Sequence, residues 1–258
     1  METNLSPGTA KRRFLIKWLL IAFSLVSLYF FAFTYLIDRR PFVEWTLIKG
    51  GPEEEKAQAQ LIKMPDGKII LINAGDAEGS LLFFLKKQKI KDIDVIVLSS
   101  NTSLSTSGLN GMFKAGIRIK EFWTNPLVFP NPNWATILEL IQTKSIPIRF
   151  LRPGGALYQS EVSQLAVVSL ARDSLALKLT HGSNKVLLIL SEASSLKSEN
   201  LHLGCELFPV DILLDYTEGV GKQKAWESCA VASNNLGKQK GTFKLLLKGD
   251  SYRWKRSR

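Results

Sequence analysis

The stretch LSSNTSLSTSGL, residues 98–109, stands where an α/β protein usually keeps its chemistry. The apolar run DIDVIVL (Asp92–Leu98) before it is typical of a buried strand, and LNGMFKAG (Leu109–Gly116) after it predicts a short helix. Loops between such strands and helices commonly form binding sites. This loop holds serine, threonine, asparagine, leucine and glycine, so it offers hydroxyl and amide groups but no acid, base or strong metal ligand.

Strong metal ligands are scarce in the rest of the chain as well. Its two histidines, His181 and His202, lie in HGSN and ENLHLG, and both are expected to be ordinary solvent-exposed side chains. A hydrolytic zinc site needs about three protein ligands for each ion. An alternative set of metal ligands could be sought in the second half of the chain, but the candidates follow no recognised ligand spacing. They are Glu192, Asp211, Asp215, Glu218, Cys205 and Cys229. The two cysteines fit a disulfide and a pair of free buried thiols equally well.

Other catalytic classes have little support. The sequence contains no G-x-S-x-G element, and no His–Asp pairing that would activate a serine can be argued. It has no G-x-G-x-x-G fingerprint or phosphate loop, and GVGKQK (Gly219–Lys224) lacks the rest of such a motif. A serine–lysine arrangement stays open because both residue types are common.

The positive charge is concentrated at the two ends. The 258 residues carry a net charge of +11, of which +4 falls in residues 1–40, +7 in residues 238–258, and none in residues 41–237. The last stretch interleaves basic and aromatic residues, which can hold single-stranded nucleic acid through charge and stacking. Candidate contacts are Lys248, Arg253, Trp254, Lys255, Arg256 and Arg258. A solvated terminus and contact with an anionic membrane surface are the other readings.

The N-terminal region predicts a membrane anchor. Residues 18–37 are uncharged, and twenty helical residues span roughly 30 Å, the thickness of a bilayer's hydrocarbon core. A cleaved signal peptide would have a shorter apolar run and a small-x-small cleavage site, which is not evident in FAFTYLIDRR. Four basic residues before the run and two after it favour a cytoplasmic N-terminus and an extracytoplasmic domain.

Strand-like and helix-like segments alternate after the anchor. PDG (Pro65–Gly67) and HGSN (His181–Asn184) each predict a tight hairpin. Strands are predicted at 59–64, 68–73, 94–98, 146–151, 165–170, 175–180, 185–190, 210–214 and 242–247, and helices at 80–90, 109–116 and 134–145. Such a mixture of hairpins and helices indicates two packed sheets with helices outside them.

The order of these segments resembles the metallo-β-lactamase superfamily, and within it the soluble domain of ComEC-type competence proteins, which take part in bacterial DNA uptake. The resemblance runs from about Thr46 to Tyr252. MPDGKIILINAG (Met64–Gly75) resembles the family's P-x-G-K-x-x-L-I-D-x-G hairpin. IKDIDVIVLSSNTSLSTSGL (Ile90–Leu109) resembles its I-x-x-I-D-x-x-V-L-T-H-x-H-x-D-H-x-G-G-L stretch. The framework residues match, but the metal ligands do not.

The resemblance also says where the ligands would stand. The family's metal-binding histidines and aspartate fall on Ser100, Thr102, Leu104 and Ser105, and the acid of its L-I-D-x-G falls on Asn73. Later family ligands fall on Glu192, Thr217 and Lys238. Serine and threonine hydroxyls are poor zinc ligands and leucine is none, so no metal or other cofactor is expected. The loop at 98–109 is interpreted as a vestigial metal loop whose small polar residues satisfy backbone groups, with Ser105 or Ser107 capping the next helix.

These observations predict an αββα metallo-β-lactamase-like sandwich of the α+β class, preceded by one transmembrane helix. The expected divisions are a basic segment (1–17), an anchor (18–37), the degenerate domain (41–247) and a basic tail (248–258). The leading hypothesis is a non-catalytic, single-pass inner-membrane protein that serves as an accessory or scaffold in DNA uptake or another envelope complex, with a protein partner and DNA contact. The alternatives are a hydrolase or phosphodiesterase with an atypical site, and a structural envelope protein without a nucleic-acid role.

Overall fold

A computed structural model describes residues 7–38, 42–49, 58–75, 79–126, 132–171, 174–191, 210–216, 230–235, 242–249 and 251–257. The chain divides into two compact units, Met1–Pro41 and Phe42–Arg258.

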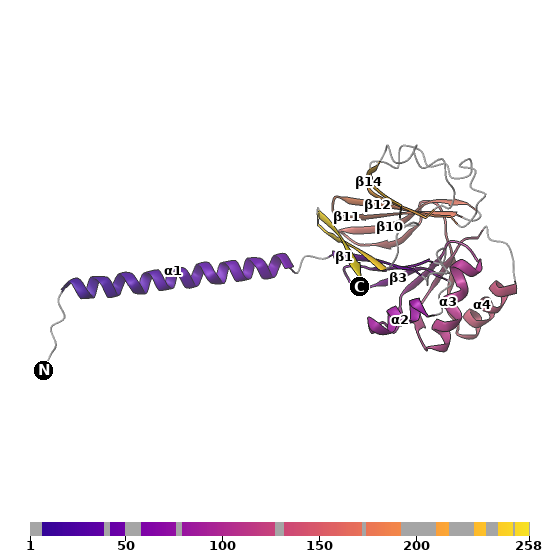
Figure 1. Ribbon diagram of the computed structural model, residues 1–258, viewed down its shortest axis with the longest axis horizontal. Helices are drawn as coiled ribbons and strands as arrows, with labels where there is room; N and C mark the ends of the chain where they lie inside the picture. The colour runs from indigo at the N-terminus through magenta and orange to yellow at the C-terminus, as the bar shows by residue number, and fades with distance from the viewer. Residues whose placement is uncertain are drawn as a thin grey trace. The chain divides into compact units, whose positions relative to one another are not determined.

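The first unit contains one long helix, α1 (Pro7–Asp38), drawn in indigo in Figure 1. Pro7 occupies its first turn, where a missing N–H costs no hydrogen bond, and no glycine or proline interrupts it from Thr9 onward. The described side chains, residues 17–32, are all exposed, including the large apolar Leu19, Phe23 and Phe31. Among the helices described with their side chains, none is long and apolar enough to cross a membrane. The anchor at residues 18–37 therefore stays a prediction.

The second unit is built on an eight-stranded sheet with the order β16-β15-β1-β2-β3-β5-β7-β8. Neighbours from β16 to β3 pair antiparallel, whereas β3, β5, β7 and β8 pair parallel. The strands are β1 (Phe42–Lys49), β2 (Gln58–Lys63), β3 (Ile69–Ala74), β5 (Val95–Leu98), β7 (Phe122–Thr124), β8 (Ile148–Phe150), β15 (Thr242–Lys248) and β16 (Ser251–Ser257).

Three helices connect the parallel strands and pack on one face of this sheet. They are α2 (Ser80–Lys87), α3 (Ser103–Lys114) and α4 (Pro132–Thr143). Their apolar residues recur at helical spacing and meet the sheet in one buried cluster, which includes Leu81, Leu85, Leu109, Met112 and Ile141 from the helices and Leu71, Ile96 and Phe122 from the strands. Helical crossovers are the usual connection between parallel strands because such strands cannot be joined by a tight hairpin.

A six-stranded sheet with the order β14-β13-β12-β11-β10-β9 lies against the other face. Its strands are β9 (Ala156–Gln159), β10 (Ser163–Ala171), β11 (Ser174–His181), β12 (Asn184–Ser191), β13 (Val210–Tyr216) and β14 (Ala230–Asn235). A second buried cluster fills the space between the two sheets, with Trp45, Ile62, Ile70 and Val97 from the first sheet and Leu165, Leu177 and Leu188 from the second. Figure 1 shows the resulting layers of the described residues: helices, sheet, sheet.

A short parallel ladder joins β4 (Asp92–Ile93) to β6 (Arg118–Ile119) beside the large sheet. Both predicted hairpins are confirmed, since β2 pairs with β3 around Gly67 (φ 85°) and β11 pairs with β12 around Gly182 (φ 58°). The positive φ of both turns is the conformation that glycine adopts at little cost.

Two sequence expectations need correction at this level. The helix expected at 109–116 begins earlier, at Ser103, so most of the serine-rich stretch is its first two turns. The strand at 242–247 was expected to be the last, with a solvated end after it, but Ser251–Ser257 forms β16 and pairs antiparallel with β15. Gly249, with φ 57°, provides the turn between them.

Candidate functional site

Neutral polar side chains meet at the carboxyl ends of β3, β5 and β7. Asn73 stands near the end of β3, Ser99 and Ser100 follow β5, and Asn125 follows β7. Each of the four is at most 6% exposed. Ligands of open α/β sheets bind at the carboxyl ends of the strands. This is therefore the place where the resemblance puts the metal ligands, and it is filled with amides and hydroxyls.

Asn73 fastens β3 to the chain that leaves β5. Its Nδ2 donates to Ser99 Oγ at 2.9 Å, and its Oδ1 accepts the Ser99 N–H at 3.0 Å. Asn73 has a φ of 53°, in the left-handed region that asparagine tolerates better than most residues. Asn125 completes the link to β7, because its Nδ2 donates to the Ser99 carbonyl at 3.2 Å.

The predicted ligand positions Ser100, Thr102 and Ser105 are brought together, but they bond to one another. The Ser100 hydroxyl donates to Ser105 Oγ at 3.2 Å and lies 3.1 Å from Thr102 Oγ1. It also accepts the Thr102 N–H at 3.2 Å. Leu104, the fourth position of this set, lies in the first turn of α3, with its side chain outside the described part. We call the group formed by Asn73, Ser99, Ser100, Thr102 and Ser105 the hydroxyl–amide network.

The prediction that Ser105 or Ser107 caps the following helix is wrong. Thr102 holds the N-cap position, with φ −70° and ψ 165°, and both serines lie inside α3. Ser105 is fully buried, and its hydroxyl bonds into the network rather than to a helix end. Thr106 Oγ1 donates to the Thr102 carbonyl at 2.7 Å, which ties the first turn together.

Helix α3 lies directly on the end of β3 at Gly108. The Gly108 N–H donates to the Gly75 carbonyl at 3.0 Å. A Cβ on residue 108 would stand 2.2 Å from the carbonyl oxygen of Ala74, far inside van der Waals contact. Glycine at this position is thus required by the close approach of helix and strand.

The side chains at this place do not fit a hydrolytic zinc ion. Zinc prefers thiolate, imidazole and carboxylate ligands, whereas the network offers neutral oxygens that bond to one another. Within the described residues, no three or more histidine, cysteine or acidic side chains gather in a metal-binding group. Several candidate positions lie outside the described residues and are not placed: Glu192, His202, Cys205, Thr217, Glu218, Cys229 and Lys238.

Asp211 and Asp215, proposed as parts of a replacement site, lie at different ends of β13. Four residues of strand place their backbone positions about 13 Å apart. The Asp211 carboxylate accepts the backbone N–H of Lys185 at 2.6 Å. Asp211 therefore joins the amino end of β13 to β12, which is a structural role.

The expectation that His181 is solvent-exposed is wrong. It is 2% exposed, and its Nδ1 lies 2.7 Å from Ser163 Oγ, which is 3% exposed. The two residues face each other as a register pair of β10 and β11. Only tertiary pairing reveals this serine–histidine contact, since the sequence separates the two by 18 positions. Their burial keeps substrate away, so the pair holds the two strands together.

Removing the hydroxyl of that pair should destabilise the protein. We expect Ser163→Ala to lower the free energy of unfolding by about 1–2 kcal/mol, because a buried hydrogen bond is lost. Chemical denaturation of wild type and variant measures the difference. Gln164→Ala, at the exposed neighbouring position, should change stability by less than about 0.5 kcal/mol. Equal stabilities of Ser163→Ala and wild type would contradict this role.

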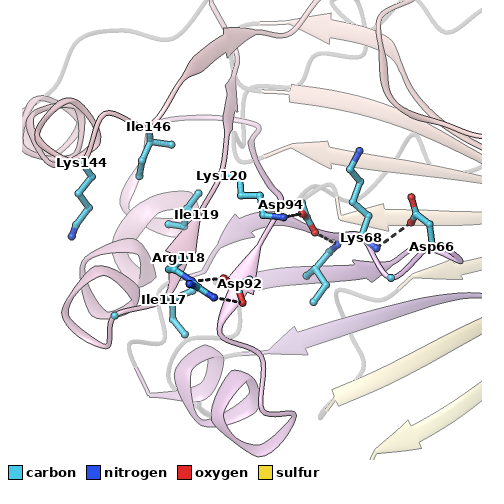
Figure 2. Close-up of a pocket in the computed structure, with 13 residues that line it drawn as sticks. Asp66, Lys68, Asp92, Asp94, Ile117, Arg118, Ile119, Lys120, Lys144 and Ile146 are labelled. Carbon is cyan, nitrogen blue, oxygen red and sulfur yellow. Dashed lines mark hydrogen bonds and ion pairs between the residues drawn. The ribbon is translucent and has the colours of Figure 1, made fainter.

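A charged groove of about 1030 Å³ opens at the opposite, amino ends of the parallel strands (Figure 2). Its charged lining residues are Asp66, Lys68, Asp92, Asp94, Arg118, Lys120 and Lys144. Several of these charges pair with one another: Arg118 binds Asp92 through two nitrogens, and Lys120 binds Asp94 at 2.6 Å. The hydrogen bond from Arg118 lowers the pKa of Asp92.

Asp94, a framework residue of the resemblance, anchors the start of β3. Its Oδ2 accepts the Ile69 N–H at 2.8 Å, and its Oδ1 accepts from Lys120. Burial by itself would raise the pKa of this carboxyl, but the hydrogen bonds from Lys120 and from the Ile69 N–H outweigh it, so the pKa is lowered. The framework acid is therefore kept ionised for structural reasons.

Asp94→Asn should destabilise the protein in a pH-dependent way. Because the pKa of Asp94 is lower in the folded chain, its stabilisation is present above the usual value of 3.8 and is lost as pH falls through the folded pKa. We expect a loss of about 1–2 kcal/mol at neutral pH that narrows below pH 3.8. Denaturation at several pH values measures it. Asp66→Asn, at an exposed turn residue, is the control; a difference that is constant with pH would contradict the expectation.

The candidate nucleic-acid contacts fall on two faces of β15 and β16. Lys248, Arg253 and Lys255 alternate with residues whose side chains point between the sheets. Trp254 is half-buried and packs against the core between the sheets. Its partner in the neighbouring strand β15 is Leu245, which belongs to that core. Arg256 lies in β16 with its side chain outside the described part, and Arg258 lies outside the described residues.

Comparison with known proteins gives likenesses of structure alone. The sequence matches no protein-family profile and no curated protein. The solved structures that resemble part of the chain include a diphosphatase from the PhnP family, with 14% identity, a TM-score of 0.41, and coverage of 67% of this chain and 73% of the other. They also include the metallo-β-lactamase fold protein YhfI from Bacillus subtilis, with 15% identity, a TM-score of 0.44, and coverage of 67% and 70% of the two chains. A third is Zn²⁺-bound PqqB from Methylobacterium extorquens, with 10% identity, a TM-score of 0.43, and coverage of 66% and 69%. Such distant likenesses do not assign an activity. The second unit is a mixed α/β domain with two packed sheets, and proteins of the metallo-β-lactamase fold are among the solved structures it resembles.

Proposed function

We propose that this chain is a membrane-anchored protein whose second unit is a metallo-β-lactamase-like sandwich without the family's metal-dependent catalysis. In this proposal it acts as an accessory or scaffold in an envelope complex. DNA uptake is the process that the ComEC-type sequence resemblance suggests. The hydroxyl–amide network carries the proposal, because it occupies the carboxyl ends of β3, β5 and β7 with side chains that are buried and bonded to one another.

The chemistry of the network supports a structural use of this place. Each buried hydroxyl or amide would cost free energy if it were left without a partner, and here the partners are the neighbouring hydroxyls, amides and backbone groups. A metal ligand set would instead leave an open position for water. In this proposal the carboxyl ends of the strands, where the resemblance places the metal ligands, are filled with groups that neither ionise near neutral pH nor bind zinc well.

The membrane anchor is supported by α1. The uncharged residues 18–37 lie within this helix, and most of its described side chains, among them Trp18, Phe23 and Phe31, are large, apolar and exposed. Exposed apolar surface of that extent is unfavourable in water and favourable in a bilayer. The basic residues on its N-terminal side favour a cytoplasmic N-terminus, which would place the second unit outside the cytoplasm.

The metal content of the purified full-length protein tests the proposal that the second unit lacks metal-dependent catalysis. After exposure to excess zinc and manganese and removal of unbound ions, we expect less than about a tenth of an equivalent per chain by elemental analysis, because the network lacks suitable ligands. One or two tightly held ions per chain would overturn the proposal. The atypical hydrolase would then be favoured, and Glu192→Gln and Asp215→Asn would show whether those acids hold the ion.

A further inference from the structure

We propose that the outer face of β16, β15 and β1 is a docking surface for an anionic lipid bilayer. This inference rests on the proposed anchoring of the chain. It adds a second membrane contact, made by the folded second unit. In this contact the basic residues near the C-terminus bind lipid headgroups.

Strand register places the basic side chains on one face. In β15, Leu245 and Leu247 belong to the core between the sheets, so the alternate residues Lys244 and Lys248 face the other way. Lys244 pairs with Lys255 of β16 across the strands. Because successive side chains of a strand point to opposite faces, Arg253 joins this face as well. We call it the basic face.

The basic face continues across β1 to β2. Glu44 of β1 stands opposite Lys63 of β2, and Lys63 is exposed. The Glu44 carboxylate is bound by Lys244 at 2.5 Å. Among the described residues the face therefore carries one acid against five cations, which leaves an excess of four positive charges; the cations are Lys63, Lys244, Lys248, Arg253 and Lys255.

An apolar residue accompanies these charges. Phe42, the register partner of Lys248, begins β1 and is 42% exposed. Cations with a neighbouring exposed aromatic ring are typical of surfaces that settle at a lipid headgroup layer. Each Lys or Arg close to an anionic leaflet adds favourable energy that falls off within the Debye length.

Chain length supports a bilayer as the partner. Three residues, 39–41, lie between Phe42 and Asp38, the last residue of α1, so four Cα–Cα steps, at most about 14 Å of chain, join the end of the helix to the start of β1. If α1 is in the bilayer, the tether holds this face close to the headgroups at a high effective concentration.

Nucleic acid is the less favoured occupant. Single strands bind through charge together with stacking of bases on aromatic rings. Trp254, the residue best suited to stacking, packs against the core between the sheets on the other side of β16. Of the described rings, the basic face keeps Phe42 at the start of β1 but not Trp254, so successive bases would not find a series of rings on which to stack.

Lysine footprinting of the full-length protein tests the proposal. The protein is reconstituted into phosphatidylcholine vesicles with and without phosphatidylglycerol, and acylation of each lysine is measured by mass spectrometry. We expect labelling of Lys63 and Lys255, both exposed, to fall about fivefold with phosphatidylglycerol and to recover at high salt. Lys86 and Lys87, exposed on α2, are the internal controls and should not change.

A double variant makes the test specific. Arg253→Gln with Lys255→Gln should remove the protection of Lys63, whereas Lys86→Gln with Lys87→Gln should leave it intact. Unfolding curves of both variants show whether the fold is kept. Stronger protection by a single-stranded oligonucleotide than by phosphatidylglycerol would overturn the lipid assignment.

The outcomes separate this inference from the anchor. If the chain floats with both vesicle types and its lysines are labelled equally in both, the anchor is supported and the proposal that the basic face binds lipid is overturned. Flotation with phosphatidylglycerol vesicles alone, together with lysine protection, would support the face and overturn the anchor. Absence of both flotation and protection would overturn both.

Discussion

Gly108→Ala should be among the most destabilising single substitutions in this protein. The added Cβ would lie 2.2 Å from the Ala74 carbonyl oxygen, and that atom belongs to the backbone of a buried strand and cannot rotate away. Relief requires α3 to move off β3, which would stretch the Gly108 N–H to Gly75 hydrogen bond of 3.0 Å. We expect a loss of about 3 kcal/mol or more in the free energy of unfolding, at the upper end of overpacking effects.

Chemical denaturation of the full chain measures this loss. Gly79→Ala is the matched control, since a Cβ at residue 79 meets nothing within 4 Å. Its cost should stay below about 1 kcal/mol, the size of an N-cap effect. If Gly108→Ala were as mild as the control, the close approach of α3 and β3 described above would be wrong.

Asn73→Ala should have the second large effect. The substitution removes the acceptor of the Ser99 N–H and the donor to Ser99 Oγ, and both partners are buried. It also places alanine at a φ of 53°, a region that costs a side chain with a Cβ about 1 kcal/mol. Together these terms predict a loss of about 2–4 kcal/mol.

Asn73→Gly separates the two contributions, because glycine removes the same hydrogen bonds but accepts the positive φ. We expect its loss to be smaller than that of alanine by about 1 kcal/mol, as measured by the same denaturation experiment. Equal stabilities of wild type and Asn73→Ala would show that the hydroxyl–amide network does not hold β3 to β5.

The fold was predictable from sequence wherever local chemistry decides it. The hairpins at Pro65–Gly67 and His181–Asn184 were predictable because glycine permits the turn that the flanking strands require. Helices α2 and α4 were predictable from apolar residues at helical spacing. These signals reside within a few consecutive residues, so no long-range pairing had to be known.

Other features depend on pairings between distant residues. β16 is polar and basic, and β15 provides the ladder that makes it a strand. His181 is polar and follows a strand, so the sequence suggests exposure, but its contact with Ser163 satisfies it in the interior. The start of α3 at Ser103 was missed because serine and threonine have low helix propensity, which burial of Ser105 in the network overrides.

The location of the candidate site was predictable, but its internal bonding was not. The framework around residues 98–109 indicated the strand end correctly, and the residue types indicated weak ligands. Which hydroxyl bonds to which amide depends on the left-handed turn at Asn73 and on the approach of Gly108, and both need the assembled sheet.

β16 stands at the end of the eight-stranded sheet, and strands in that position present unpaired backbone groups that can recruit another chain. Here that strand alternates Arg253 and Lys255 with aromatic residues. A second copy pairing edge to edge would bring like charges together across the new ladder. Arg253 and Lys255 therefore oppose extension of the sheet by a second copy of the chain, and neutral substitutions at these two positions would weaken that repulsion.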